Sequence, residues 1–425
     1  MKNSEILCDL LGVSQAACAY VLEAEEALSA LFARVEAVEM ANQAKVLAAF
    51  QQERIAQRHF APTTGYGYDD TGRDALDRVF AHALDAEDAL VRAQITTGTH
   101  AIFLALSGLL EPGDTMLSVT GKPYDTLDRA IGISGDEPGS LKRLGVQFKQ
   151  VPLKEDRIDM DAVLGQIDGT VKVLYIQRSR GYAWRNALLP GDMPFEQLHR
   201  AAPHAAIVVD NCYGEFTGTQ EPCAFGADVQ IGSLIKNPGG GIAPTGGYIA
   251  GKKAFIARIE HKLTVPGQGR EVGSYAGGYL PFYQGLFLAP HTTAQSIKTA
   301  ILFAKVFENA GLVTLPRSGD VRSDIVQALR FDSEEALCAF CRSIQRAAPV
   351  DSFVVPEPWE MPGYSDKVIM AAGAFIEGSS IELSADAPIV VPYTAYVQGG
   401  LTYSHGRIGV LYAVDELMRL GYIRE

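Results

Sequence analysis

The chain has 425 residues, of which 47% are hydrophobic, and its formal net charge at pH 7 is −13. Nucleic acids and anionic membranes require a concentrated positive field, so this balance argues against both and favours a small-molecule partner. No N-terminal apolar signal segment and no run of ~20 apolar residues is present, so a cytoplasmic protein without a membrane span is expected.

Six cysteines are too few for a disulfide framework in a chain of this length. Cys338 and Cys341 form one Cys-x-x-Cys pair. An amphipathic helical pattern that follows Ser333 surrounds them, so two buried side chains are expected there rather than a metal or redox site.

The first 58 residues predict one or two helices, because apolar residues recur at helical spacing from Ile6 to Leu11 and from Val21 to Phe50. The stretch from Pro62 to Arg73 concentrates Gly, Thr, Tyr and Asp, which indicates an ordered loop.

From Asp74 to Gly251, helical patterns alternate with short strand patterns. Such alternation predicts parallel βαβ units with helices on both faces of a sheet. The predicted strands are residues 93–96, 115–119, 171–176, 206–209 and 229–231.

A long predicted helix at 292–310 leads into a region with strand patterns at 352–355 and 368–370. The expected organisation is an N-terminal helical segment (1–58), a large α/β domain with a mostly parallel sheet (59–290) and a smaller α+β domain (291–425).

Five residues stand at or just after the carboxyl ends of predicted strands, the edge at which open α/β sheets bind ligands. They are Thr97, Tyr124, Arg178, Asp210 and Lys236.

Thr97, Gly98 and Thr99 follow one strand and open an apolar helix. The free N–H groups at a helix start bind phosphate, and Gly98 allows close approach; a threonine-capped helix with no ligand is the alternative. Neither a P-loop nor a dinucleotide-binding glycine motif occurs between a strand and a helix, so a small phosphorylated cofactor is favoured over a nucleotide.

Lys236 stands after a predicted strand and is followed by Asn-Pro-Gly-Gly-Gly, and Asp210 ends the preceding strand. A lysine that holds pyridoxal 5'-phosphate (PLP) as a Schiff base needs an aspartate that keeps the pyridine nitrogen protonated. The alternatives are a solvated lysine and an aspartate that caps a helix or binds a metal; no cluster of metal ligands accompanies it, so no metal is expected. Tyr124 can stack on the ring or simply pack in its loop, and Ser233 can bond the phosphate.

Together these motifs resemble PLP-dependent enzymes of the aspartate-aminotransferase fold (fold type I), and within them the cystathionine and methionine lyases. They resemble most closely the bacterial family called methionine gamma-lyase-like or aluminium resistance proteins. The matching motifs are GYGYDD (65–70), TGTHA (97–101), PYDTL (123–127), QRSRGY (177–182), VDNCYGEF (209–216), SLIKNPGG (233–240) and GSSIELSAD (378–386).

The resemblance implies that Lys236 carries the cofactor, that Asp210 bonds its ring nitrogen and that Tyr124 stacks on it. It also implies that Gly98, Thr99 and Ser233 hold the phosphate.

Tyr66 and Tyr68 match the tyrosines of a Tyr-x-Tyr-x-Arg stretch that reaches the phosphate from a neighbouring subunit, which implies a homodimer or homotetramer with shared sites. Two positions depart from the lyase pattern. Asp70 stands where the arginine is expected, with Arg73 nearest, and Ile235 replaces the hydroxyl residue before the lysine.

An amino-acid substrate needs a partner for its carboxylate, best supplied by arginine. Arg178 and Arg180 are the candidates, followed by Arg407, and surface arginines are the alternative for each. The predicted activity is β- or γ-elimination from a sulfur-containing amino acid such as cystathionine, cysteine or methionine. Transamination, or PLP binding with little turnover in a stress response, are the competing hypotheses.

Overall fold

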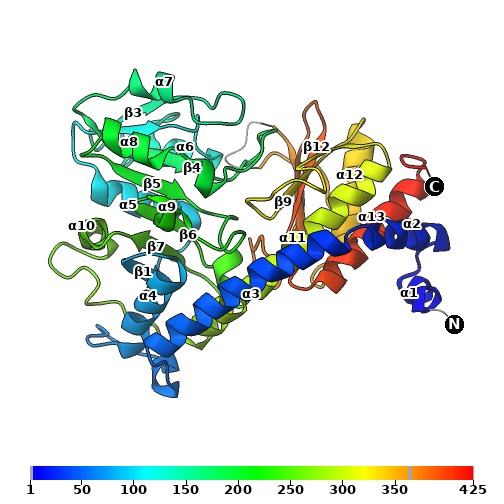
Figure 1. The fold of residues 1–425 in the computed structure, drawn as a ribbon, viewed down its shortest axis with the longest axis horizontal. Helices are drawn as coiled ribbons and strands as arrows, with labels where there is room; N and C mark the ends of the chain where they lie inside the picture. The colour runs from blue at the N-terminus through cyan, green and yellow to red at the C-terminus, as the bar shows by residue number, and fades with distance from the viewer. Residues whose placement is uncertain (1–2, 362–365, 425) are drawn as a thin grey trace. The chain divides into compact units, whose positions relative to one another are not determined.

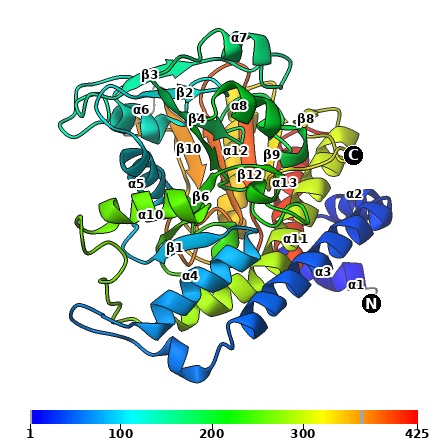
Figure 2. The ribbon, with the colours of Figure 1, turned by 60° about the vertical axis from the view of Figure 1, so that its left-hand side comes forward.

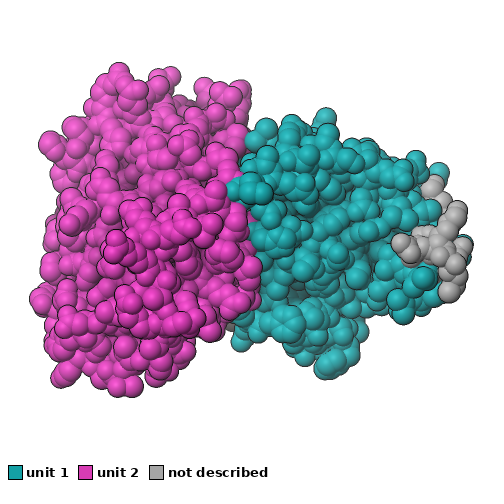
Figure 3. All heavy atoms as spheres, turned by 60° about the horizontal axis from the view of Figure 1, so that its bottom comes forward, with its two compact units in different colours: residues 1–40, 291–425 teal, residues 41–290 magenta. Residues whose placement is uncertain are grey.

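The structure, a computed structural model, describes residues 3–361 and 366–424. The chain forms two compact units, one of residues 41–290 and one of residues 1–40 with 291–425 (Figure 3). The division falls inside two long helices, α3 (Ser29–Gln52) and α11 (Leu280–Asn309). The predicted three-part division of the chain at residues 58 and 290 stays a prediction.

The larger unit contains a seven-stranded sheet in the order β1-β7-β6-β5-β4-β2-β3 (Figure 1). Its neighbouring strands pair in parallel except for β7, which is antiparallel to both β1 and β6. The strands are β1 (Asp88–Arg92), β2 (Thr115–Ser118), β3 (Gln147–Gln150), β4 (Val171–Gln177), β5 (Ala206–Asp210), β6 (Val229–Ser233) and β7 (Gly247–Gly251). The predicted α/β fold with a mostly parallel sheet is confirmed.

Helices cover both faces of this sheet, and α4 packs along β1 (Figure 2). Alternate residues of each strand enter different cores, as strand geometry requires: Val173 and Tyr175 join the core under α5 and α10, while Leu174 and Ile176 join the core under α8. The helices are α4 (Thr71–Ala83), α5 (Gly98–Leu109), α6 (Asp125–Ile131), α7 (Met160–Leu164), α8 (Phe195–Ala201), α9 (Pro222–Phe225) and α10 (Lys253–Leu263), with 3₁₀ turns η1 (Gln57–Phe60), η2 (Pro190–Asp192) and η3 (Asn237–Gly239).

The first strand of the sheet lies earlier than the sequence predicts. Residues 93–96 form a turn, and the strand is β1. Charged residues at both of its ends, Asp88 and Arg92, disguise the apolar pattern. Arg92 is nevertheless buried, because it forms an ion pair with Asp77 at 2.5 Å. A buried pair of this kind cannot be read from hydrophobic periodicity.

The smaller unit has a five-stranded antiparallel sheet among its described residues, in the order β10-β11-β12-β9-β8. Its strands are β8 (Val313–Leu315), β9 (Val326–Arg330), β10 (Val368–Ala371), β11 (Ser384–Pro388) and β12 (Thr394–Gln398). Its helices are α1 (Asn3–Leu11), α2 (Gln15–Glu26), α12 (Glu334–Ala347) and α13 (Tyr403–Arg419).

The predicted strand at residues 352–355 is wrong. A turn in which the Val354 N–H donates to the Asp351 carbonyl occupies this stretch, and Phe353 is 84% exposed. Three consecutive β-favouring residues predict a strand only where a neighbouring strand pairs with them.

Only two of the six cysteines are joined by a disulfide in the described residues. Cys8 and Cys18 form a disulfide that joins α1 to α2, and four free cysteines remain in the described ranges. Cys338 and Cys341 are both buried in α12. None of the helices in residues 3–361 and 366–424 has the length and apolar character of a membrane span.

Candidate active site

Three segments meet at the carboxyl edge of the larger sheet. Asp210 ends β5, Ser233 ends β6 and Gly98 begins α5. A β-carbon added to Gly98 would lie 3.4 Å from both the Cys212 sulfur and the Ser233 β-carbon. The structure therefore brings together the predicted phosphate loop, the predicted acid and the strand that leads to Lys236.

The start of α5 has the features of an anion site. The Thr97 hydroxyl accepts the His100 N–H at 3.0 Å and caps the helix, and the Thr99 hydroxyl contacts the Thr126 hydroxyl at 2.7 Å. Across from them, the buried Ser233 hydroxyl has no hydrogen-bond partner within the residues that the structure describes. Leaving a buried hydroxyl unbonded costs about 1–3 kcal/mol, so these residues fit a bound phosphate whose oxygens accept from them.

Asp210 is 5% exposed and held in a polar environment. One carboxylate oxygen accepts the Cys212 N–H at 3.1 Å, and the other lies 3.4 Å from the Tyr175 hydroxyl. Burial raises the pKa of Asp210, while the charge of Lys236 and these hydrogen bonds lower it, and the net direction is upward. A cationic partner would therefore be strongly attracted to this carboxylate.

Lys236 follows β6 and is half-buried. Its Nζ lies 3.9 Å from the ring centroid of Tyr213, in the geometry of a cation–π contact. Burial lowers the pKa of the Lys236 ammonium, but the acidic groups around it, from Cys212 to Glu215, raise it more. Burial also raises the pKa of the Cys212 thiol well above its usual range, so this thiol carries no negative charge near pH 7.

The loop of residues 211–217 carries Tyr213 to its position under Lys236. Tyr213 and Phe216 have φ angles of +70° and +61°, a region that is unfavourable for bulky side chains. The Asn237 side-chain amide holds the loop from one side, donating to the carbonyls of Tyr213 at 3.1 Å and Glu215 at 3.0 Å. The strained backbone is therefore stabilised by the residue next to Lys236.

Arg178 holds the same loop from another side. Its guanidinium donates to Asn211 Oδ1 at 2.6 Å, to the Gly214 carbonyl at 2.8 Å and to the Thr217 hydroxyl at 3.1 Å. Its Nε donates to the Leu188 carbonyl at 3.2 Å. All three guanidinium nitrogens of Arg178 thus donate to groups of the protein, and its predicted role as a ligand of the substrate carboxylate stays a prediction.

We expect Arg178→Ala to lower the free energy of unfolding by about 3 kcal/mol or more, because several buried acceptors lose a charged donor at once. Urea denaturation measures this change. Arg200→Ala is the control: Arg200 pairs with Glu196 at 2.9 Å between exposed side chains, and its loss should cost under about 0.5 kcal/mol. Equal effects of the two substitutions would contradict the assignment.

The other two candidate arginines lie in different places. Arg180 is 2% exposed in the loop that follows β4, close in sequence to Arg178. Arg407 belongs to α13 of the smaller unit, where it pairs with Glu25 at 3.1 Å. The role of both in substrate binding stays a prediction.

Tyr124 stands at the start of α6 beside the loop that contains Arg180. Its backbone N–H donates to the Gln177 side chain at 2.6 Å, and its ring meets the Tyr182 ring edge-on with centroids 6.3 Å apart. Sequence reasoning missed Gln177, which links β4 to this tyrosine. Its position could have indicated this role, because Gln177 is a polar residue at the end of a mostly apolar strand.

Tyr66 and Tyr68 are 69% and 61% exposed, and their rings stack with centroids 5.5 Å apart. Both belong to the larger unit, in the loop before α4. Arg73 is buried and donates to the Gly67 carbonyl at 2.8 Å, which fixes the turn between the two tyrosines. The loop therefore presents both rings to solvent.

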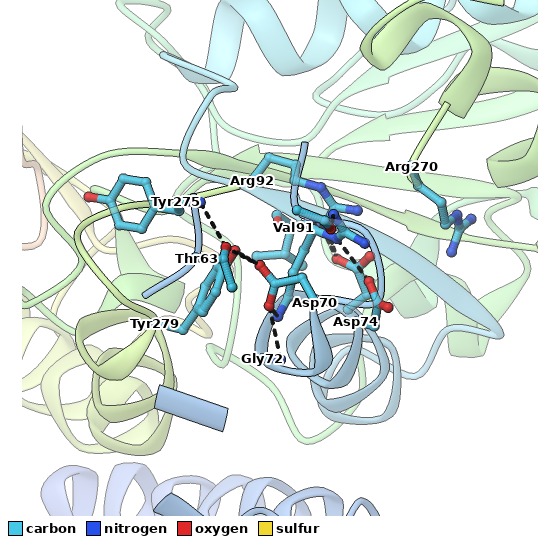
Figure 4. Close-up of polar contacts among 12 residues, drawn as sticks. Thr63, Asp70, Gly72, Asp74, Val91, Arg92, Arg270, Tyr275 and Tyr279 are labelled. Atoms are coloured by element: carbon cyan, nitrogen blue, oxygen red, sulfur yellow. Dashed lines mark hydrogen bonds and ion pairs between the residues drawn. The ribbon is translucent and has the colours of Figure 1, made fainter. Parts of the chain in front are cut away.

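Asp70, which replaces the arginine of the lyase pattern, is a buried helix cap (Figure 4). One of its oxygens accepts the N–H groups of Gly72 and Arg73 at 3.1 and 3.0 Å, and the other accepts from Thr63 and Tyr279. In this chain the position is the N-cap of α4, a role that needs a side-chain acceptor and that an arginine cannot fill.

Restoring the arginine should therefore damage the protein. We expect Asp70→Arg to destabilise the fold by about 3 kcal/mol or more, since it removes the cap and places a cation beside buried Arg73. Asp70→Asn keeps the shape and a side-chain acceptor, and should cost about 1–2 kcal/mol. Thermal denaturation of both variants tests this, and an unchanged melting temperature in Asp70→Arg would contradict it.

No cluster of three or more His, Cys, Asp or Glu side chains suited to a metal ion occurs in the described part of the chain. The site is instead built from a lysine, an aspartate, hydroxyl groups and backbone N–H groups. The fold around it is similar to that of the pyridoxal-5'-phosphate-dependent protein YhfS from Escherichia coli, with a TM-score of 0.60, 16% identity and coverage of 89% of this chain and 95% of that one. The fold is that of PLP-dependent enzymes of fold type I.

Closer relatives give the family. The methionine gamma-lyase family profile matches residues 18–418, and the chain belongs to this family. A solved structure of the carbon-sulfur lyase involved in aluminum resistance from Clostridium novyi NT is 46% identical, with a TM-score of 0.94 and coverage of 98% of this chain and 99% of that one. The uncharacterized protein YnbB of Bacillus subtilis (strain 168) is 46% identical over 402 residues, 94% of this chain and 96% of that protein. The chain is thus an enzyme of the PLP-dependent lyase type.

Proposed function

We propose that this enzyme is a carbon–sulfur lyase that binds PLP through Lys236 and performs β- or γ-elimination on a sulfur-containing amino acid. The observation that carries the proposal is the meeting of Gly98, Asp210 and Ser233 at one edge of the sheet, with Lys236 three residues beyond Ser233. The name of the Clostridium novyi relative supports the carbon–sulfur part of the proposal.

PLP, when bound, supplies an electron sink for the negative charge that forms at the substrate α-carbon. In this proposal Asp210 pairs with the ring nitrogen, and Tyr124 covers a face of the ring. Gly98, Thr99 and Ser233 hold the phosphate, for which the unbonded Ser233 hydroxyl is the supporting observation.

Asp210 also influences the charge of Lys236. Without the cofactor, Asp210 is among the acidic groups that raise the pKa of the Lys236 ammonium. A positively charged ring nitrogen would compete for the same carboxylate and so weaken its hold on the proton of Lys236 Nζ. Lys236 would then be a better nucleophile and, with its amine free, could act as a base for the α-proton.

The substrate carboxylate needs an arginine, and we propose Arg180. The guanidinium nitrogens of Arg178 donate to groups of the protein, whereas Arg180 lies two residues further along the loop that borders Tyr124. Arg407 is the alternative ligand.

We further propose that Tyr66 and Tyr68 complete the phosphate site of a second subunit in a homodimer or homotetramer. Their exposure and mutual stacking support this, because a pair of solvent-exposed aromatic rings is stabilised when another protein surface packs over it.

A substrate screen tests the elimination. Cystathionine, cysteine and methionine are incubated separately with the PLP-loaded enzyme, and thiol, ammonia and 2-oxo acid are measured together. Equal amounts of 2-oxo acid, ammonia and thiol (hydrogen sulfide from cysteine) are expected, with the Cα–H, C–S and Cα–N bonds broken and one water consumed. Amino-group transfer to the cofactor without thiol release would instead identify a transaminase, and no product from any amino acid would contradict a lyase.

A further inference from the structure

A second buried acid, Glu215, lies behind Lys236 and has no part in the function proposed above. It is 0% exposed, and its Oε1 accepts the Tyr248 hydroxyl at 2.9 Å. Its Oε2 has no hydrogen-bond partner among the side chains and backbone that the structure describes. A buried carboxyl group with one unbonded oxygen is costly, and such groups gather at functional sites.

The strand that leads to Lys236 is shaped to accept this acid. Tyr248 on β7 pairs directly with Gly232 on β6. A β-carbon at Gly232 would lie 2.3 Å from Glu215 Oε1 and 2.4 Å from the Tyr248 ring. Any side chain at residue 232 would therefore displace the Glu215–Tyr248 pair, so the missing side chain makes room for it.

Glu215 also belongs to the loop that shapes the surroundings of Lys236. Asn237, the residue after Lys236, donates to the Glu215 and Tyr213 carbonyls. Tyr213 in turn places its ring under Lys236 Nζ. The same Asn237 amide thus holds the Glu215 backbone and the backbone of the tyrosine whose ring contacts the lysine.

Several charged or titratable groups face Glu215. Burial, followed by the charge of Glu221, raises the pKa of Glu215 to about 8, against the opposing effects of Tyr248 and Lys236. Glu221 itself accepts a side-chain N–H of Asn211 at 2.9 Å and the backbone N–H of Phe216 at 2.8 Å. Cys212 and Asp210 complete the acidic surroundings of Lys236.

We propose that Glu215 is a positioning residue for Lys236. Through its hydrogen bond to Tyr248 it fixes the loop that carries Tyr213. When the Glu215 carboxyl group gains or loses a proton, the affinity of Lys236 Nζ for its proton changes. The inference rests on the proposed function, because it concerns the lysine that would carry PLP. Glu215 touches neither substrate nor cofactor in this proposal.

The first test uses the cofactor-free protein and the variant Glu215→Gln. A carboxyl group whose pKa is higher in the folded state stabilises the fold fully below its unfolded pKa and loses that effect as the pH rises through its folded pKa. The wild type should therefore lose stability relative to Glu215→Gln between about pH 4.5 and about pH 8. The difference in melting temperature, followed across this range, should grow in favour of the variant. A difference that is constant with pH would overturn the inference.

The second test titrates the absorbance of PLP bound to Lys236. An ionised Glu215 favours the proton on Lys236 Nζ, so the midpoint of the titration should fall by about one pH unit in Glu215→Gln. Tyr248→Phe removes a donor that lowers the pKa of Glu215, so it should shift the midpoint the same way by less. Glu87→Gln, which changes an exposed glutamate outside the site, should leave it unchanged.

These outcomes separate the two proposals. An unchanged midpoint in Glu215→Gln, with Lys236 still binding the cofactor, would overturn only the role of Glu215. Absence of any lysine-bound cofactor in the wild type would instead contradict the proposed function. If Glu215→Gln does not fold, Tyr248→Phe decides the question, because it keeps the carboxyl group and removes only a hydroxyl.

Discussion

Lys236→Ala should lose lyase activity by about 10³-fold or more, since the variant lacks the amine proposed to bind PLP and to remove the α-proton. The absorbance band of lysine-bound PLP should disappear with it. Activity assays and absorption spectra of the PLP-incubated protein measure the two losses.

The control for this variant is Lys252→Ala. Lys252 pairs with Asp228 at 2.6 Å at the amino ends of the strands, the opposite edge of the sheet from Lys236. This substitution should leave the lysine-bound absorbance intact. If Lys236→Ala kept that band, another lysine would hold the cofactor.

Asp210→Asn should lower activity by about 10²-fold while the fold persists. An amide cannot supply the negative charge that keeps a ring nitrogen protonated, and a charge-assisted hydrogen bond is worth about 1.5–3 kcal/mol. Since burial raises the pKa of Asp210, the wild-type carboxylate costs stability as the pH rises, and the neutral amide avoids this cost. At pH 7 the activity of Asp210→Asn should therefore fall without a matching fall in its melting temperature.

Asp228→Asn is the matched variant for Asp210→Asn. Asp228 is 2% exposed, accepts the Ile207 N–H at 2.8 Å and pairs with Lys252, so its loss should destabilise the sheet. Cofactor binding should survive. Equal losses of activity in the two variants would mean that Asp210 acts only through stability.

The elements that the sequence predicts well are those whose apolar pattern is uninterrupted. The strands at 171–176, 206–209 and 229–231 correspond to β4, β5 and β6, and the candidate-site residues Asp210 and Ser233 end β5 and β6. Their order along the chain equals their order in the sheet, apart from direction, so residues that follow each of them had to lie close together.

The missed elements depend on contacts between distant residues. β7 runs antiparallel within a mostly parallel sheet, and nothing in its short sequence Gly247–Gly251 states its direction. The contacts of Arg178 also cannot be predicted from the sequence, because three of its acceptors lie in a loop more than 30 residues away. The cytoplasmic location, the oligomeric state and the identity of the substrate remain predictions.

Gly232 gives a simple rule for comparing sequences. Because any β-carbon there would collide with both Glu215 and Tyr248, a relative with alanine or serine at this position cannot keep that pair in the same place. The three positions should thus be inherited together, and an enzyme that lacks the glycine should also lack the buried acid. The pH range over which such relatives work should differ accordingly, although their lysine and aspartate are the same.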